Sequence, residues 1–179
     1  MIYIPAEDSF LLEEQVKLYA KGKSVLDIGS GSGIQALAAL SAGAKSVLAS
    51  DIDKESINHI KQINSKIKAI KSNLFSNVKG RFDLIVFNPP YLPEDEREDE
   101  QSKRATTGGK KGDEIILRFL KQSAHHLNRD GKILIVISSL TPSKRIVMLL
   151  KTLNLSHKIL SSKKLFFEKL EVWEIKQSL

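Results

Sequence analysis

Four short apolar segments alternate with stretches of helical periodicity, and this alternation limits the folds open to the 179-residue chain. The segments are rich in β-branched residues and almost uninterrupted by polar ones, which is typical of central strands in a parallel sheet covered on both faces. The pattern therefore predicts an α/β doubly wound sheet. The predicted strands are 24–29, 46–50, 83–87 and 132–138, and the predicted helices are 33–43, 53–64 and 112–131, with Gly43 and Gly131 as helix stops.

The rest of the chain predicts the edges of this sheet. Residues 66–73 interleave lysines with apolar residues, which suits an edge strand because lysines discourage pairing with other chains. After a helix over 141–154, with Pro142 in its first turn, residues 157–176 predict two antiparallel strands joined by a tight connection. We therefore expect seven strands, mostly parallel, with a C-terminal hairpin. Residues 92–112 form the one long irregular segment, which is typical of a functional or disordered loop.

Length and composition predict one cytosolic domain over residues 1–179. An apolar content of 41% lets a chain of this length bury about two thirds of its unfolded surface. The N-terminus carries acids where a signal peptide needs positive charge, and no apolar stretch approaches the length of a membrane span. With no cysteine and four scattered histidines, no self-contained metal site is expected.

The formal net charge of +7 is unevenly distributed along the chain. Residues 94–100 hold six acids and one base, a net of −5, so the other residues carry +12. A basic surface favours a nucleic-acid or ribonucleoprotein partner through phosphate attraction, although lysine-rich surfaces also arise from solubility alone. Both interpretations stay open.

A glycine-rich turn follows the first predicted strand. Asp27, Gly29, Gly31 and Gly33 form the pattern D-x-G-x-G-x-G directly before a helix. Glycines let the backbone approach a ligand and adopt positive φ, and in doubly wound folds this turn binds an adenosine-containing cofactor. The dinucleotide fingerprint requires its third glycine at position 34, which is isoleucine, and no P-loop lysine is present.

The next two predicted strands end in polar residues that suit a nucleoside. Asp51 lies 22 residues after Gly29, where a carboxylate can accept both ribose hydroxyls. Either Asp51 or Asp53 can instead cap the following helix, and we favour that role for Asp53. Asn73 and Leu74 follow the edge strand and could contact an adenine, with the Asn73 amide oxygen as acceptor.

The fourth strand ends in Asn88, Pro89, Pro90 and Tyr91 at the same edge of the sheet. An amide or amino-purine NH₂ is a poor nucleophile because its lone pair is delocalised. A site for it should therefore offer acceptors only, and the Asn88 oxygen and the Pro89 carbonyl fit, since prolines add no donor. Tyr91 can stack on the planar group. An ordinary Asn-Pro turn with a packed tyrosine is the alternative.

In this order, the glycine turn, the ribose acid and N-P-P-Y resemble class I S-adenosylmethionine-dependent methyltransferases that act on a planar nitrogen. Residues 3–14, YIPAEDSFLLEE, resemble the opening of the HemK-related glutamine methyltransferases of archaea and eukaryotes, which modify the Gly-Gly-Gln glutamine of class I release factors. That resemblance implies that Ser9 contacts the methionine moiety, with Glu7 and Asp8 close by. Asp8 or Ser9 could also be a helix N-cap.

The resemblance also implies the remaining roles. Asn73 stands where relatives often have Asp, which weakens the adenine contact but keeps an acceptor. A small zinc-binding activator is implied at the sheet edge, and the lack of cysteine fits zinc residing in that partner, although the lysines at 66, 68 and 71 make this edge polar. The implied contacts are Asp27 and Gly29 at the methionine end, Gly31 elsewhere on the cofactor, Asp51 at the ribose, Asn73 and Leu74 at the adenine, and Asn88 at the amide.

Two competing functions are weighed against glutamine methylation. Adenine-N6 and guanine-N2 methyltransferases of RNA or DNA share N-P-P-Y, but no appended nucleic-acid recognition domain is evident in this chain. A non-catalytic cofactor-binding subunit is the other candidate, and the intact N-P-P-Y argues against it.

Overall fold

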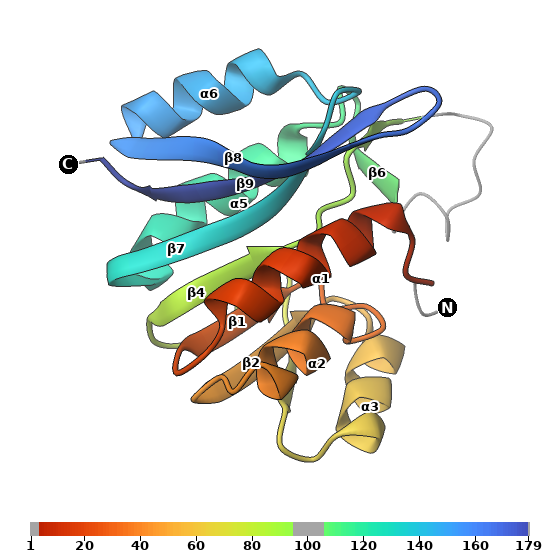
Figure 1. Cartoon of the computed structure of the whole chain (residues 1–179), viewed down its shortest axis with the longest axis vertical. Coiled ribbons are helices and arrows are strands. Elements are labelled where there is room, and N and C mark those ends of the chain that lie inside the picture. Colours follow the sequence, from red (N-terminus) through yellow and green to blue (C-terminus); the bar gives the residue numbers. More distant parts are fainter. Residues whose placement is uncertain (1–3, 95–105, 179) are drawn as a thin grey trace.

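A seven-stranded mixed sheet forms the centre of the protein in the computed structural model, which describes residues 4–94 and 106–178 (Figure 1). The strand order is β3-β2-β1-β4-β7-β9-β8, in which the first five strands are parallel and β9 is antiparallel to both its neighbours. This confirms the predicted architecture. The strands are β1 (Ser24–Ile28), β2 (Ser46–Asp51), β3 (Lys68–Lys71), β4 (Phe82–Phe87), β7 (Leu127–Ser138), β8 (Leu155–Lys164) and β9 (Lys169–Gln177).

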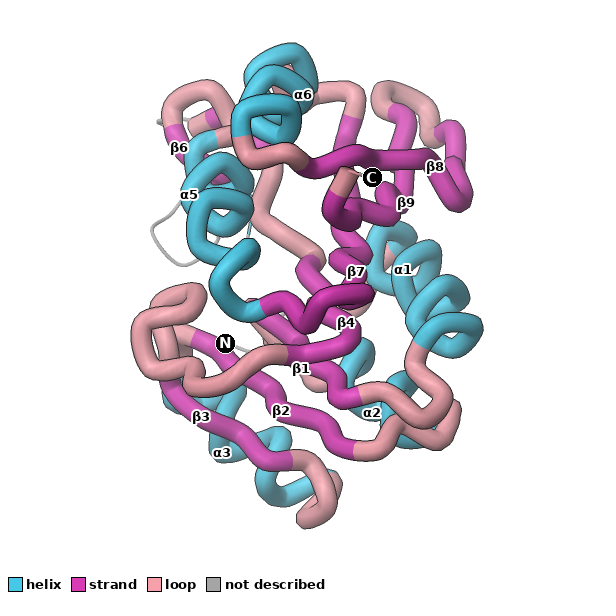
Figure 2. Tube along the Cα trace, turned by 90° about the vertical axis from the view of Figure 1, so that its left-hand side faces the viewer, coloured by secondary structure: helices cyan, strands magenta, loops and turns pink. Residues whose placement is uncertain are grey.

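Helices cover both faces of the sheet, as Figure 2 shows with α1 on one side and α5 and α6 on the other. One apolar core lies between the sheet and the first three helices, and a second core lies between the sheet and the last two. The helices are α1 (Glu7–Tyr19), α2 (Ile34–Ser41), α3 (Lys54–Ile63), α5 (Glu114–Ser123) and α6 (Ser143–Thr152), with a 3₁₀ turn η1 (Ala124–His126) after α5.

The two cores explain why the central strands are apolar throughout. In β4, Leu84 and Val86 pack into the core beneath α1, whereas Ile85 and Phe87 pack into the core beneath α5. Successive side chains of a strand point to opposite faces, so covering both faces requires apolar residues at every position. The uninterrupted run that predicted this strand is a direct consequence.

Both predicted sheet edges are confirmed. The lysine-bearing segment forms β3 at one edge, with Lys68 and Lys71 exposed. The C-terminal hairpin forms the other edge, where β9 inserts between β7 and β8. Because β8 runs in the same direction as β7, the connection between β8 and β9 lies at the carboxyl ends of the parallel strands.

The predicted helix over 112–131 is too long. Helix α5 ends at Ser123, and strand β7 already begins at Leu127. Gly131 is therefore not a helix stop but lies inside an irregularity of β7, where the pairing with β4 shifts. A Cβ on this glycine would lie 2.9 Å from the carbonyl oxygen of Phe82. The close approach of two backbones requires glycine here, which sequence periodicity cannot distinguish from a helix end.

The segment over 92–112 has structure at both of its ends. A two-residue strand, β5 (Leu92–Pro93), pairs with β6 (Thr107–Gly109) in a separate small sheet. Most of the acidic run lies among residues 95–105, outside the described ranges. Strand β5 therefore follows the N-P-P-Y segment directly, and β6 pairs with it.

Helix α1, which precedes the first strand, should contribute strongly to the stability of the folded protein. Leu12 is fully buried against the sheet, whereas Leu18 on the same helix is 74% exposed. We expect Leu12→Ala to lower the free energy of unfolding by about 2–5 kcal/mol, because it leaves a cavity. The matched Leu18→Ala should change it by less than about 0.5 kcal/mol. Urea denaturation measures both, and equal effects would contradict the assignment of α1 to the core.

Candidate active site

The register of the central strands brings the predicted site residues to one edge of the sheet. Ile28 at the end of β1 pairs with Ser50 of β2 on one side and with Phe87 of β4 on the other. The next residues along the three strands are Gly29, Asp51 and Asn88. Three predicted site residues therefore lie side by side at the carboxyl ends of adjacent strands.

The glycine turn has the backbone conformation that the sequence predicts. Gly29, Gly31 and Gly33 have φ values of +63°, +49° and +82°, a region that side-chain-bearing residues rarely adopt. A Cβ on Gly29 would also lie 3.3 Å from the ring of Phe87. The turn leads into the N-terminus of α2, where backbone N–H groups attract negative charge or ligand oxygens.

Asp27 lies beneath this turn and is almost completely buried. Its Oδ2 atom accepts no hydrogen bond from any described residue. Burial, and then the nearby Asp51 carboxylate, raises its pKa to about 7, although the Ser30 side chain acts in the opposite direction. A buried acceptor without a donor is costly, and it marks the position where a cationic or hydrogen-bonding group of a ligand would bind.

Asp51 is half-buried at the end of β2 and organises the turn opposite. Its two oxygens accept from the backbone N–H groups of Gly31 and Asp53, both at 2.8 Å. Burial raises its pKa, and these hydrogen bonds act against the rise. Each carboxylate oxygen has a second lone pair, so a ligand hydroxyl can still bind. Asp53 caps α3 through a bond from the Glu55 N–H, which confirms the capping role favoured for it.

The segment after β3 forms a tight turn around a buried serine. Ser72 Oγ donates to the Leu74 carbonyl oxygen at 2.8 Å and accepts from the Asn77 N–H at 3.0 Å. Leu74 has a φ of +50°, an unusual value for a branched residue and a form of strain found at ligand sites. Asn73 is exposed, and its amide oxygen accepts from Arg118 of α5 at 2.9 Å. Sequence reasoning did not identify this arginine.

Asn88 is held from the opposite side by the start of α1. Its Nδ2 donates to Asp8 Oδ2 at 3.2 Å and to Ser9 Oγ at 3.3 Å. Both partners lie within the first turn of α1, where Ala6 is the N-cap, so the alternative role of Asp8 or Ser9 as N-cap is wrong. The Asn88 Oδ1 atom is buried and has no hydrogen-bond donor among the residues described. The structure thus directs the amide oxygen away from α1.

The three residues after Asn88 fix the path of the chain. Pro89 is buried, Pro90 is half-buried, and Tyr91 packs beside both apolar cores. The Tyr91 carbonyl accepts from Thr141 Oγ1 at 3.2 Å. A Cβ on Gly112 would lie 2.6 Å from that same carbonyl oxygen, so the β5–β6 region packs directly against the backbone of this segment.

Gln35, in the first turn of α2, is a site residue that sequence reasoning missed. Its Nε2 donates to the Ser9 carbonyl oxygen at 2.8 Å, and its buried Oε1 has no donor within residues 4–94 and 106–178. It thus ties the glycine-turn helix to α1. The available signal was a glutamine among the apolar residues of the helix, where a buried amide needs polar partners.

The arrangement offers acceptors at two separate points along one edge of the sheet. Asp27 Oδ2 lies beneath the glycine turn. Asn88 Oδ1 lies just after the end of the adjacent strand β4, two residues beyond Val86, the register partner of Asp27. A cation or amine at the first point and an NH₂ group at the second would satisfy both. Such a site can bind and orient a nitrogen nucleophile, and no described group of histidines or acids is arranged to hold a metal.

Comparison with known families identifies the chain. The family described as "Methyltransferase small domain" matches residues 7–166, which include every element around the site. The chain belongs to this methyltransferase family.

Two relatives and one solved structure extend the comparison. A Methanocaldococcus jannaschii protein, provisionally named a protein N5-glutamine methyltransferase, is 40% identical over 177 residues, covering 96% of this methyltransferase and 89% of that protein. The ribosomal protein L11 methyltransferase of Lactobacillus acidophilus is 37% identical over 119 residues, covering 64% of this chain and 31% of its own. The Mtq2 structure from the E. cuniculi Mtq2–Trm112 complex has a TM-score of 0.79 at 22% identity, covering 99% of both chains.

In the part of the methyltransferase that the structure describes, no helix is both long and apolar enough to cross a membrane.

The raised pKa of Asp27 should make stability depend on pH in the ligand-free methyltransferase. Between the ordinary value of 3.8 and about 7, the folded state keeps a proton that the unfolded chain has released, so stability falls as pH rises through this window. Relative to Asp27→Asn, the wild type should lose at most about 1.4 kcal/mol per pH unit up to about pH 7, and little above it. Urea unfolding of both proteins across this range measures the difference, and a pH-independent difference would contradict the assigned pKa.

Proposed function

We propose that the protein transfers a methyl group from S-adenosylmethionine to a planar NH₂ group. The residues fit this cofactor. Asp27 would bind the α-amino group at Oδ2, which has no donor among the described residues, and the turn through Gly29 and Gly31 would approach the methionine moiety. Asp51 would accept the ribose hydroxyls. When bound, the cofactor supplies a methyl sulfonium that carries its own leaving group.

At the adenine end, the turn after β3 supports the same proposal. Leu74 is held in a left-handed conformation beside Asn73, whose amide oxygen currently accepts from Arg118. An adenine amino group would share or replace that donor. Ser9, in the first turn of α1, would lie at the methionine end, because it contacts both Asn88 and Gln35.

The single observation that carries the proposal is the buried amide oxygen of Asn88, which accepts no hydrogen bond from residues 4–94 or 106–178. Its Nδ2 is engaged by α1, so an incoming NH₂ group meets an acceptor. Pro89 and Pro90 have no N–H to compete, and Tyr91 can stack on a planar group. Catalysis would rest on orientation and preorganised electrostatics, and the proton can leave after the transfer.

The substrate that we propose is the glutamine side chain of the Gly-Gly-Gln motif in a class I release factor, methylated at N5. The relative at 40% identity, provisionally named a protein N5-glutamine methyltransferase, supports glutamine. The likeness in fold to Mtq2, from a complex described as methylating the termination factor eRF1, is compatible with a release factor. The N-terminal segment supports the same choice, because its Asp8 and Ser9 contact Asn88 directly.

We further propose that the protein acts in the cytoplasm, together with a small partner subunit. This subunit would pair along the free edge of β3. The edge strand is four residues long and has a sheet neighbour on one side only, among the strands that the structure describes. An unpaired edge offers backbone groups to another chain. A zinc ion would reside in that partner, since this chain has no cysteine. Full activity of the monodisperse chain alone would refute the need for it.

Asn88→Ala should separate catalysis from cofactor binding. Loss of the acceptor should reduce methyl transfer by about 100-fold or more, because the NH₂ group is no longer oriented. Affinity for S-adenosylmethionine should stay within about threefold, since Asn88 is assigned to the acceptor amide. The matched control is Asn128→Ala. It removes an asparagine that is hydrogen-bonded to Asp83 near the amino ends of β7 and β4, away from the proposed site. Calorimetry beside a radiolabel transfer assay measures both, and unchanged turnover in Asn88→Ala would end this mechanism.

A substrate panel tests the choice of glutamine. Labelled S-adenosylmethionine is offered with release factor, with its Gly-Gly-Gln→Gly-Gly-Ala variant, with ribosomal protein L11, with total tRNA and with duplex DNA. We expect label on the wild-type release factor alone. Label on tRNA or DNA would assign the NH₂ group to a base instead, and label on the Gly-Gly-Ala variant would exclude that glutamine.

A further inference from the structure

Two exposed phenylalanines occupy the tip of the β8–β9 hairpin. Phe166 is 92% exposed and Phe167 is 85% exposed, and their rings contact edge to face with centroids 4.6 Å apart. Single exposed apolar residues are ordinary on protein surfaces. Adjacent apolar rings at a projecting turn form a patch of the kind that marks an interaction site.

The register of the sheet places this tip beside the opening of the active site. Strand pairing sets Val136 of β7, Val172 of β9 and Ser161 of β8 at the level of Asn88. Residues 165–168 therefore lie about 13 Å farther in the direction in which the central strands point, and about 14 Å to the side. In Figure 1, the hairpin extends toward the same side of the molecule as the beginning of α1.

The tip is held in place by a hydrogen bond within the turn and by contacts with the end of β7 and the start of α1. The Leu165 N–H donates to the Glu168 carbonyl at 2.8 Å, and Ser138 Oγ donates to the Glu168 carboxylate at 2.6 Å. Lys163 forms an ion pair with Glu7, the first residue of α1. The rings are thus presented on an ordered turn, which lowers the entropy cost of binding.

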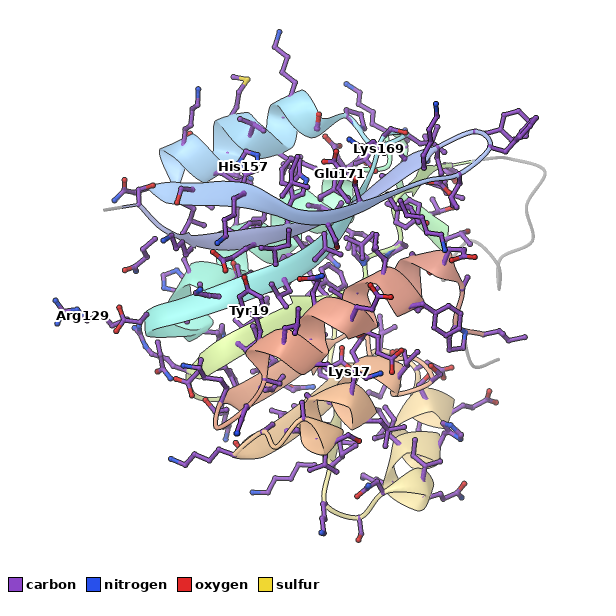
Figure 3. All side chains as sticks on the ribbon, in the orientation of Figure 1. Lys17, Tyr19, Arg129, His157, Lys169 and Glu171 are labelled. Atoms are coloured by element: carbon purple, nitrogen blue, oxygen red, sulfur yellow. The ribbon has the colours of Figure 1, made fainter. Side chains whose placement is uncertain are left out.

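The charges around the tip indicate the class of partner. Lys163 pairs with Glu7. Lys169 pairs with Glu171 at 2.7 Å on β9, and both of these residues are labelled in Figure 3. The charged residues on and beside the tip are three lysines and three acids, so their net charge is zero. They are Lys163, Lys164, Lys169, Glu7, Glu168 and Glu171. Binding to a nucleic-acid backbone needs an excess of positive charge. A neutral surface with apolar rings fits a protein.

We propose that Phe166 and Phe167 form a docking surface for the protein substrate, contacting apolar residues of the release factor beside the segment that carries the glutamine. This inference rests on the proposed function. The rings contact the substrate at a distance from Asn88 and keep the glutamine segment near it. Because they do not touch the reacting atoms, they contribute to substrate affinity and not to the chemical step.

The test is a double variant, Phe166→Ser with Phe167→Ser, assayed on intact release factor. Both side chains are exposed, so the variant should fold, and thermal unfolding verifies this. We expect the KM for release factor to rise about tenfold or more, since buried aromatic anchors dominate interface energies. The kcat and the affinity for S-adenosylmethionine should stay unchanged. Met148→Ser removes a 61% exposed apolar side chain from α6 and should leave KM unchanged.

Each outcome distinguishes this inference from the proposed function. If wild-type protein does not methylate release factor, the proposed function fails before the variants are compared. If wild-type protein is active and the double variant has the same KM, the docking surface is wrong. An unchanged KM together with a loss of tRNA binding, or with a change in self-association by sedimentation, would assign the rings to another partner and overturn the proposal.

Discussion

The parallel pairing of β1 with both β2 and β4 is the constraint on which the site depends. Parallel strands in register end at one edge, so every residue that follows a central strand enters the same small volume. Gly29, Asp51 and Asn88 arrive there because Ile28, Ser50 and Phe87 are aligned across the three strands. Shifting one strand by a single residue would move each of its side chains to the core on the opposite face, where it does not fit its neighbours, and would displace its functional residue at the same time. The same strand register therefore determines both the packing of the core and the positions of the functional residues.

The strands and the residues at their carboxyl ends were predictable from the sequence because their causes are local. A strand buried on both faces must be apolar throughout, as in β4, and a turn with positive φ must contain glycine, as at Gly29. The end of α5 was not predictable, because it depends on how closely Gly131 approaches Phe82 on another strand. Helical periodicity continues through that region and carries no information about a contact 49 residues away, the separation of positions 82 and 131.

The polar contacts of the site divide in the same way. Asp51 and Asn88 could be identified because each follows a strand directly. Asp8 was placed near the cofactor, but its bond to Asn88 spans 80 residues and depends on how α1 docks. Gln35 and Arg118 were missed for the same reason, since each is recognisable only by its partner across the fold. Sequence thus located the strand ends, and tertiary packing determined which side chains meet there.

Helix α1 determines the chemical polarity of Asn88. A carboxamide has a donor and an acceptor of nearly equal size, so an unconstrained asparagine could present either one to a ligand. Asp8 Oδ2 accepts from Asn88 Nδ2, which leaves the Asn88 Oδ1 atom on the opposite side. Ser9 reinforces this orientation, because its hydroxyl can donate to Asp8 and still accept from Asn88. Leu12 and Val16 anchor α1 in the apolar core, about one and two turns after Ser9. Their burial therefore helps to keep an acceptor, not a donor, facing an incoming NH₂ group.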